Sequence, residues 1–333
     1  MDVDAYVAAH RGEWDRLEEL VRRRGRLDGA ESEELVDLYQ RVATHLSVVR
    51  SSSPDPALVG RLSTLVAQAR SAVAGTRSPA WSDLGRFFSE GFPAAVYLAR
   101  RWWIGAALGF LAVAVVVGWW VAVTPEVQAA VATPEEIRRL IEQDFADYYT
   151  SSPAASFAGR VWTNNAWIAA FALIGGGLLG IPTLYLLWQN AFNIALVAGL
   201  MASAGRLDLF FGLITPHGLL ELTAVWVAAG VGLRFGWTVI DPGPLPRGRA
   251  VAAAGRTAAG VALGLAVVLL VSGVIEAFVT PSGLPTWVRI GIGVAAWSAF
   301  MAYVFVLGRR AARRGVTGDV TGADVADVAP VAG

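Results

Sequence analysis

The first hundred positions alternate between polar and apolar residues with the period of an amphipathic helix. The segment WDRLEELV places its tryptophan, leucines and valine on one helical face. The segment EELVDLYQRVATHLSVV repeats this pattern, and a third segment begins at Asp55, a helix-capping residue, with Pro56 at the first helical position. Three such helices can bury their apolar faces against one another. We therefore predict a small helical bundle, followed by an aromatic-rich interfacial helix that leads into a membrane.

From Trp103 onward the chain becomes almost continuously apolar. A helix of about 20 apolar residues crosses a hydrocarbon core of roughly 30 Å. A shorter apolar stretch, 190–204, has the length either of a crossing or of a segment that enters and returns. Five longer stretches predict membrane-spanning helices: 104–123, 166–188, 219–237, 257–279 and 287–307.

The placement of arginines orients these spans. Arginines stand at 100 and 101 before the first span, between 309 and 314 after the last, and around the connection near 247. Because cytoplasmic flanks are enriched in basic residues, all three regions are predicted to lie in the cytoplasm. Both ends on one side require an even number of crossings. The stretch 190–204 is therefore predicted to cross, which gives about six spans.

The predicted fold is an all-α, polytopic membrane helix bundle with a small cytoplasmic helical domain at the N-terminus. We expect that domain and its interfacial helix over 1–100, and the transmembrane domain over 101–308. The acidic segment 124–163 is expected to be an external loop, with an amphipathic helix that starts at Thr133. Residues 315–333 are small, acidic and aperiodic, so the tail 309–333 is predicted to be disordered and cytoplasmic.

Composition narrows the chemistry that the chain can perform. Hydrophobic residues make up 55% of the 333 positions and charged residues 16%, which is typical of an integral membrane protein. A formal net charge of zero gives no support for nucleic-acid binding. The absence of cysteine excludes disulfides, thiol catalysis and thiolate metal sites. All 27 basic residues are arginines, which excludes Schiff-base chemistry at lysine.

Polar residues interrupt the apolar spans at a few places. Asn164 and Asn165 open the second span, His217 and Glu221 open the fourth, and Glu276 ends the fifth. His217 and Glu221 are four residues apart and therefore share one helical face. We interpret them as a polar clasp between helices. A proton or metal site is the alternative, and a metal would need further ligands that the sequence does not bring near.

Catalytic signatures are absent from the chain. It contains no His-Glu-x-x-His pattern, no Gly-x-Ser-x-Gly and no phosphate-binding glycine-rich loop. The glycine runs IGGGLLG and AAGVGLRFG are interpreted as close helix contacts in lipid. We predict that the protein is not an enzyme and holds no cofactor and no metal.

Several segments, taken in order, resemble the stage II sporulation protein M family of bacterial membrane proteins. They include EWDRLEEL, LYQRVATHLSVVRSSSPD, FAGRVWTNNAWIAAF, LITPHGLLELTAVW and IEAFVTPSGLP, and they extend from about residue 10 to 308. The resemblance assigns a set of polar and turn-forming motif positions. These are Asn164, Asn165, Pro216, His217, Gly218, Glu221, Glu276, Thr280 and Pro281.

The resemblance implies a non-enzymatic scaffold in the cytoplasmic membrane of a bacterium, with both termini in the cytoplasm. Its implied partners are membrane lipid and proteins bound at the N-terminal domain or the external loop, with peptidoglycan hydrolases as candidates. The residues alone leave a transporter or channel open, using the intramembrane histidine, glutamate and asparagine residues. A transporter requires these groups to converge on one wet cavity, whereas a scaffold can leave them as separate pairs.

Overall fold

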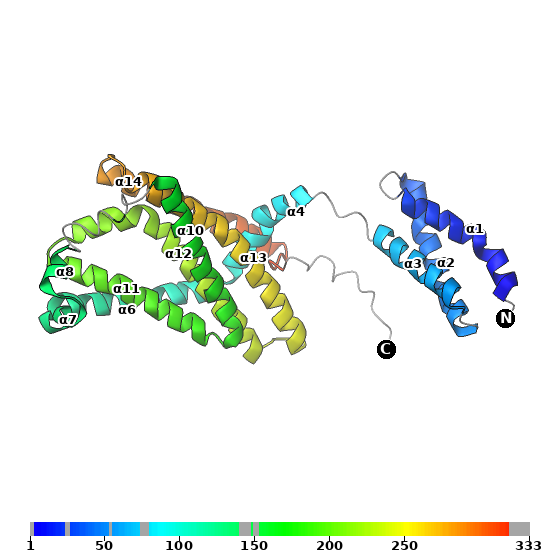
Figure 1. Ribbon diagram of the computed structural model, residues 1–333, viewed down its shortest axis with the longest axis horizontal. Helices are drawn as coiled ribbons and strands as arrows, with labels where there is room; N and C mark the ends of the chain where they lie inside the picture. Colours follow the sequence, from blue (N-terminus) through cyan, green and yellow to red (C-terminus); the bar gives the residue numbers. More distant parts are fainter. Residues whose placement is uncertain are drawn as a thin grey trace. The chain divides into compact units, whose positions relative to one another are not determined.

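A computed structural model describes residues 3–23, 27–52, 55–73, 80–139, 148 and 153–319. All regular structure among these residues is helical, which confirms the all-α prediction. Figure 1 shows the helices in chain order. The chain divides into two compact units, Met1–Leu84 and Gly85–Gly333.

The N-terminal unit is a bundle of three helices, α1 (Val3–Arg22), α2 (Gly29–Ser52) and α3 (Pro56–Val73). Asp55 caps α3 as predicted, because its carboxylate accepts a hydrogen bond of 2.9 Å from the backbone N–H of Ala57. The predicted apolar stripes form the core. The buried apolar residues are Trp14, Leu17, Leu20, Val21, Leu35, Leu38, Val42, Val49, Leu62, Leu65, Ala69 and Ala72.

Removal of the largest core side chain is expected to unfold this bundle. Trp14 is fully buried, and truncation of such a residue to alanine typically costs 3–5 kcal/mol (about half the stability of a small domain). The control is Val36→Ala on the exposed face of α2, which should change stability by at most about 0.5 kcal/mol. Thermal denaturation of a 1–84 fragment, followed by circular dichroism, measures both. Equal shifts in the two variants would contradict the assignment of Trp14 to the core.

The second unit is a membrane helix bundle. Among the described residues, five helices are long and apolar enough to cross a membrane. A further helix, α10 (Ala154–Ile174), has 21 residues but carries Arg160, Asn164 and Asn165, and it is not among the five. Helix α10 is the sixth long helix of the bundle, and the described residues hold five candidate spans where the sequence predicted about six. The five are α6 (Arg100–Val123), α11 (Ile181–Ser203), α12 (Leu207–Ile240), α13 with η4 (Arg247–Val279), and α14 with η5 and α15 (Thr286–Arg313).

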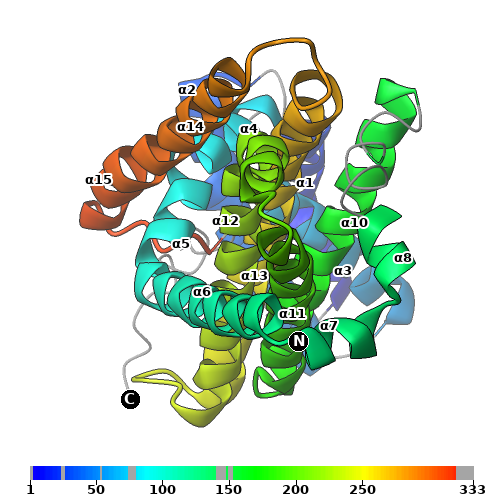
Figure 2. The same ribbon diagram turned by 90° about the vertical axis from the view of Figure 1, so that its left-hand side faces the viewer.

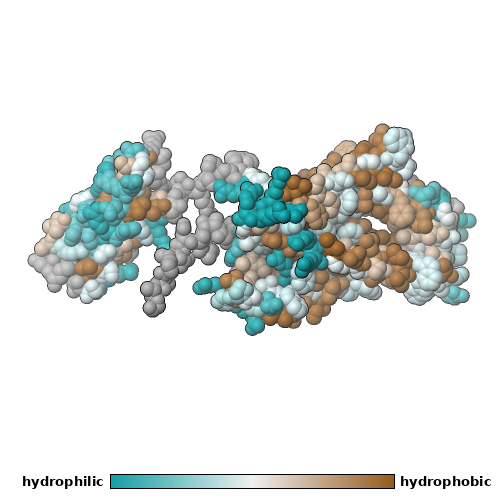
Figure 3. Space-filling view, turned by 180° about the vertical axis from the view of Figure 1, so that it is seen from behind, coloured by the Kyte–Doolittle hydropathy of each residue, from teal (hydrophilic) through white to brown (hydrophobic). Residues whose placement is uncertain are grey.

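Helix α12 is the central element of this unit. It contacts α6, α10, α11, α13 and α14, and Figure 2 shows it enclosed by them. Its most apolar window is 61% buried inside the protein, against 22% for α6 and 17% for α14. The outward faces of α6 and α14 are therefore broad apolar surfaces. Figure 3 shows apolar side chains over much of the larger unit, as expected of a surface that meets lipid.

Glycines allow the helices around α12 to approach one another closely. A side chain at Gly232 would overlap the carbonyl oxygen of Ala172 in α10. A side chain at Gly230 would overlap the backbone of Trp103 in α6. These contacts confirm the interpretation of the glycine runs as sites of close helix packing.

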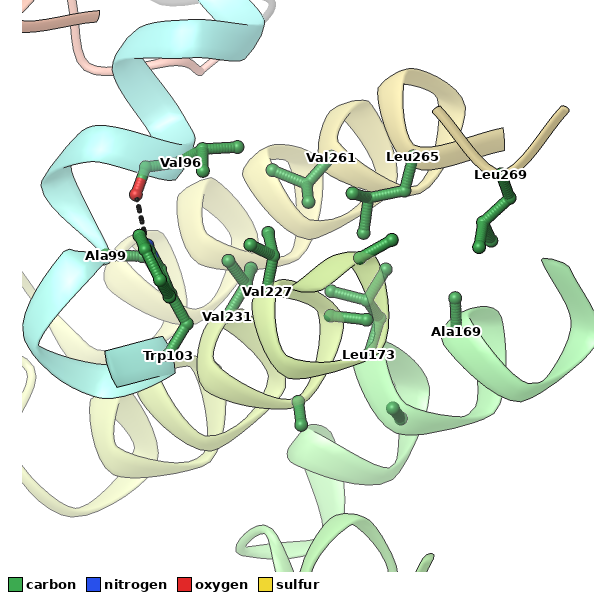
Figure 4. Close-up of a cluster of buried hydrophobic side chains, with 14 of the residues drawn as sticks. Val96, Ala99, Trp103, Ala169, Leu173, Val227, Val231, Val261, Leu265 and Leu269 are labelled. Carbon is green, nitrogen blue, oxygen red and sulfur yellow. Dashed lines mark hydrogen bonds between the residues drawn. The ribbon is translucent and has the colours of Figure 1, made fainter. Parts of the chain in front are cut away.

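The apolar core of the unit includes residues of α12, α5 (Phe92–Leu98), α6, α10 and α13 (Figure 4). Trp103 is buried in this core, and its indole N–H donates a hydrogen bond of 3.0 Å to the carbonyl oxygen of Val96. Residues 92–96 and Ala99 are buried, and they belong to the membrane unit. The boundary between the two compact units lies at 84/85, so the segment predicted as an interfacial helix belongs largely to the membrane unit, where α5 packs in the core.

The predicted span 166–188 is wrong, because the chain reverses between α10 and α11. Leu179 (φ +59°) and Gly180 (φ +76°) form a left-handed turn after a short 3-10 helix, η3 (Gly175–Leu178). The hydroxyl of Thr183 donates 2.7 Å across the turn to the carbonyl oxygen of Ala172. The stretch 190–204 is consequently the second half of α11, and α12 begins at Leu207, twelve residues before the predicted 219.

The predicted tail and loop also need correction. Part of 309–333 is ordered, because α15 (Arg309–Arg313) continues the last span and Asp319 pairs with Arg256 at 2.7 Å. Residues 320–333 lie outside the described residues. The segment 124–163 contains α7 (Pro125–Val131), α8 (Pro134–Arg139) and the start of α10. The predicted cap at Thr133 is confirmed, because its backbone N–H donates to Glu136 at 2.8 Å and its hydroxyl accepts from the Glu136 N–H.

Candidate functional site: a buried histidine–glutamate cluster

Three ionisable side chains meet inside the membrane unit. His217 and Glu221 lie on consecutive turns of α12, and Glu276 lies in η4 (Ile275–Val279), the π-helical end of α13. One nitrogen or carboxylate oxygen from each residue lies within 4.8 Å of the others. The Nε2 atom of His217 is 4.0 Å from Oε1 of Glu276, and both residues are buried. The pair expected from sequence is thus a cluster of three.

Helix α13, η4 and the residue that follows η4 present three polar side chains to His217 at a spacing of four residues. Ser272 donates its hydroxyl hydrogen to the His217 carbonyl oxygen at 3.1 Å, and the Thr280 hydroxyl lies 3.2 Å from Nδ1 of the ring. Glu276 stands between them and faces Nε2. The backbone N–H of Thr280 bonds to the carbonyl of Ile275 five residues earlier, so a π-turn sets this register.

The predicted asparagine pair reaches the cluster from α10. The Asn165 side chain is hydrogen-bonded to Glu221. Asn164, which is exposed, donates from Nδ2 to Oδ1 of Asn165 at 3.4 Å. A chain of two amides therefore leads from the surface of α10 to the buried carboxylate.

The other motif residues shape the backbone around the cluster. Pro216 lies inside α12 and not at its start, and it has no N–H to donate to the preceding turn. Gly218 is buried, and a side chain there would come within 2.8 Å of Ile214. Pro281 follows the last residue of the π-turn, where the helix ends.

Two carboxylate oxygens at the centre are unsatisfied. Oε2 of Glu221 and Oε2 of Glu276 are buried and have no hydrogen-bond partner among the residues that the structure describes. A buried carboxylate without a partner is costly, and two close together repel each other. The arrangement can therefore hold a cation or a proton between the two carboxylates.

Sequence reasoning missed three neighbours of the cluster. Ser272 could have been found from its spacing of four to Glu276 and Thr280 within an apolar helix. Arg289 donates to the Thr280 carbonyl oxygen at 2.6 Å, and no local pattern links those two residues. Burial and the negative charges of Glu276 and Glu221 raise the pKa of the Tyr148 hydroxyl, so this residue of the 124–163 segment is within electrostatic reach of the cluster.

A second, smaller cluster lies in the N-terminal unit. The Nδ1 atoms of His10 and His45 are each 3.8 Å from Oε2 of Glu13, and the indole N–H of Trp14 donates to Nδ1 of His45 at 3.2 Å. Burial, then the neighbouring His10, lowers the pKa of His45, against the opposite effect of Glu13.

This shift predicts that the bundle loses stability as the pH falls. Between the unfolded pKa of about 6.5 and the lower folded value, the unfolded chain binds a proton at His45 that the folded bundle resists. The contribution is complete above about pH 6.5 and is lost as the pH falls through the lower folded pKa of His45. Urea titrations of the 1–84 fragment at pH 7.5, 6.5 and 5.5 measure it. His45→Gln, which keeps an acceptor for Trp14 but cannot titrate, should have a flatter profile, and an unchanged slope would refute the assignment.

Comparison with known proteins covers most of the chain in two parts. A family model described as stage II sporulation protein M matches residues 107–281, which include all nine motif positions. A model described as a domain of unknown function (DUF8413) matches residues 4–75. An uncharacterised protein of Methanocaldococcus jannaschii is 30% identical over 80 residues, which make up 24% of this chain and 45% of that protein. No solved structure matches the chain.

Proposed function

Because the chain belongs to the stage II sporulation protein M family, we propose that it is a non-enzymatic scaffold that gathers protein partners at the cytoplasmic membrane of a bacterial cell. The observation that carries the proposal is the division into two units with separate cores, of which only one is a membrane bundle. A scaffold of this design offers one surface to soluble partners and others to partners within or across the membrane.

Two surfaces suit protein partners. In the N-terminal unit, Val36 exposes an apolar side chain on the polar side of α2. In the membrane unit, α7 and α8 carry glutamates and arginines on short exposed helices that follow α6. Peptidoglycan hydrolases are the proposed partners of the α7–α8 surface, because the 124–163 segment is the part of the chain assigned to the outside.

Site-specific photo-crosslinking in cells tests the scaffold. A photoreactive residue at Val36 or at Ala130 of α7 is expected to give discrete adducts with other proteins. The same residue at Val115, on the most exposed face of α6, is the control for a position that meets lipid. Adducts at 36 or 130 that are absent at 115 support the proposal. The absence of protein adducts from both test positions would count against it.

The proposed orientation predicts a simple labelling pattern. The chain has no cysteine, so single cysteines can be introduced without removal of native ones. Ala130→Cys should react with a membrane-impermeant maleimide in intact cells. Ser51→Cys in α2 and Pro244→Cys between α12 and α13 should react only after lysis. Reaction of either of these in intact cells would refute the assignment of both termini to the cytoplasm.

A transporter or channel is the second candidate, and one observation favours it. The intramembrane polar side chains cluster together, as a translocation site requires; they are His217, Glu221, Glu276 and Asn165. Ion flux into proteoliposomes that is lost in His217→Ala and Glu221→Gln would support this function. Flux that both variants leave unchanged would remove the cluster from any transport path.

A further inference from the structure

We propose that His217, Glu221 and Glu276 bind one divalent transition-metal ion, of the zinc or manganese class, inside the membrane unit. This inference does not rest on the scaffold proposal. It rests on the donor atoms, on the groups that orient them and on the charge that they leave unbalanced.

The donor atoms are close to the geometry of a metal site. Bonds of about 2.0–2.2 Å place tetrahedral ligand atoms roughly 3.4 Å apart. The three donor atoms here lie within 4.8 Å of one another, and the imidazole nitrogen is 4.0 Å from the nearer oxygen of Glu276. Small side-chain rotations close that difference. Three protein ligands leave a fourth position for water or another ligand.

The surrounding groups orient the ligands as in known metal sites. A metal-binding histidine usually holds its second ring nitrogen in a hydrogen bond, which fixes the ring. Nδ1 of His217 is paired with the Thr280 hydroxyl, so Nε2 is the atom that points to the carboxylates. Asn165 holds Glu221, and Arg289 fixes the backbone of Thr280.

Charge provides the second, independent argument. Glu276 is only 4% exposed, and its Oε2 has no hydrogen-bond partner among the described residues; the same holds for Oε2 of Glu221. A divalent cation would balance the charge of two ionised carboxylates. A neutral clasp would leave those oxygens without a partner, at the cost described above.

The donor set selects the class of ion. One imidazole and two carboxylates, without sulfur, suit zinc, manganese or ferrous iron. Calcium and magnesium favour sites built from oxygen alone. Zinc and manganese are therefore the probes to use, and neither needs a change of oxidation state.

Metal content of the full chain tests the proposal. Protein purified in detergent is stripped with chelator, equilibrated with Zn²⁺ or Mn²⁺, and analysed by mass spectrometry for bound metal. The N-terminal His10–Glu13–His45 cluster also meets the distance criterion, so the reference protein carries His10→Gln and His45→Gln. About one equivalent is expected in this reference protein. Glu276→Gln, which keeps the shape of the side chain, should abolish binding.

A milder variant keeps the test decisive if Glu276→Gln disturbs the fold. Thr280→Val removes only the hydrogen bond to Nδ1 and should weaken affinity about 10–100-fold. Bound Mn²⁺ also gives an electron paramagnetic resonance spectrum that differs from that of free Mn²⁺. The proposal is overturned if the reference protein binds less than a tenth of an equivalent, or if Glu276→Gln and Thr280→Val bind both metals as the reference does.

Discussion

Gly293→Ala is expected to destabilise the membrane unit strongly, whereas Gly291→Ala, two residues earlier in the same helix, is expected to be neutral or slightly stabilising. A methyl group at Gly293 would overlap the carbonyl oxygen of Pro216, with the carbonyl carbon at 2.7 Å. A methyl group at Gly291 would meet nothing within 4 Å. The two substitutions are chemically identical, so the difference between them isolates the contact of α14 with α12.

The change in stability of each variant depends on the balance between the helix propensity of alanine and the cost of overpacking. Replacement of glycine by alanine within a helix is worth up to about 1 kcal/mol in favour of alanine. Overpacking typically costs 1–3 kcal/mol, and more where the obstacle is backbone that cannot rotate away. The clash at Gly293 therefore outweighs the helical gain, while Gly291 receives the gain alone. Thermal unfolding in detergent measures both, and equal midpoints would contradict the close crossing.

The same substitution should disturb the polar cluster. Pro216 precedes His217, and the indole N–H of Trp297 on α14 also donates to the Thr223 hydroxyl on α12 at 3.1 Å. A displaced α14 therefore pushes on the turn of α12 that carries the imidazole. Any property that depends on the cluster should be lost in Gly293→Ala and retained in Gly291→Ala.

The sequence predicted best those helices in which apolar residues recur with the helical period on the buried face. In α1, Trp14 and Leu17 lie on the one face that meets α2 and α3, and all three N-terminal helices follow from such stripes. The helix N-caps were predicted equally well, because Asp55 and Thr133 make the capping hydrogen bonds expected at those positions. These patterns are local, so they can be recognised in the sequence without knowledge of the tertiary structure.

The turn between α10 and α11 was misplaced because hydropathy does not change there. Both sides of the turn are apolar, and a span drawn from hydropathy runs straight through it. The signals for a break were present in the three consecutive glycines from Gly175 and in Pro182 near the start of α11. They were outweighed by the continuous apolar run.

Only part of the polar cluster could be predicted from the sequence, for a different reason. The spacing of four between His217 and Glu221 is local and was recognised. The approach of Glu276 depends on the packing of α13 against α12 and on the π-turn that sets its register. Neither feature can be recognised in a short segment of sequence. Ser272 and Arg289 reach the cluster through the same helix packing.

In protein stripped of metal, Glu276→Gln is expected to be as stable as the wild type or more stable, because it removes one of two close, buried negative charges. With saturating metal the order should reverse. A ligand at 100 times its dissociation constant stabilises the native state by about 2.7 kcal/mol. For a unit of this size each kcal/mol raises the midpoint by about 2–4 °C, so the wild type should gain roughly 5–11 °C.

The reversal separates a metal site from a purely structural carboxylate. Unfolding midpoints are compared in chelator and in Zn²⁺ for the wild type, Glu276→Gln and Glu126→Gln, an exposed control in α7 that should follow the wild type in both conditions. If Glu276→Gln is less stable than the wild type even in chelator, the carboxylate supports the fold by its own contacts. If its advantage persists in Zn²⁺, Glu276 is a buried charge that no metal offsets. Only a change of sign fits a cation held between Glu221 and Glu276, because only a bound ion makes the second carboxylate favourable.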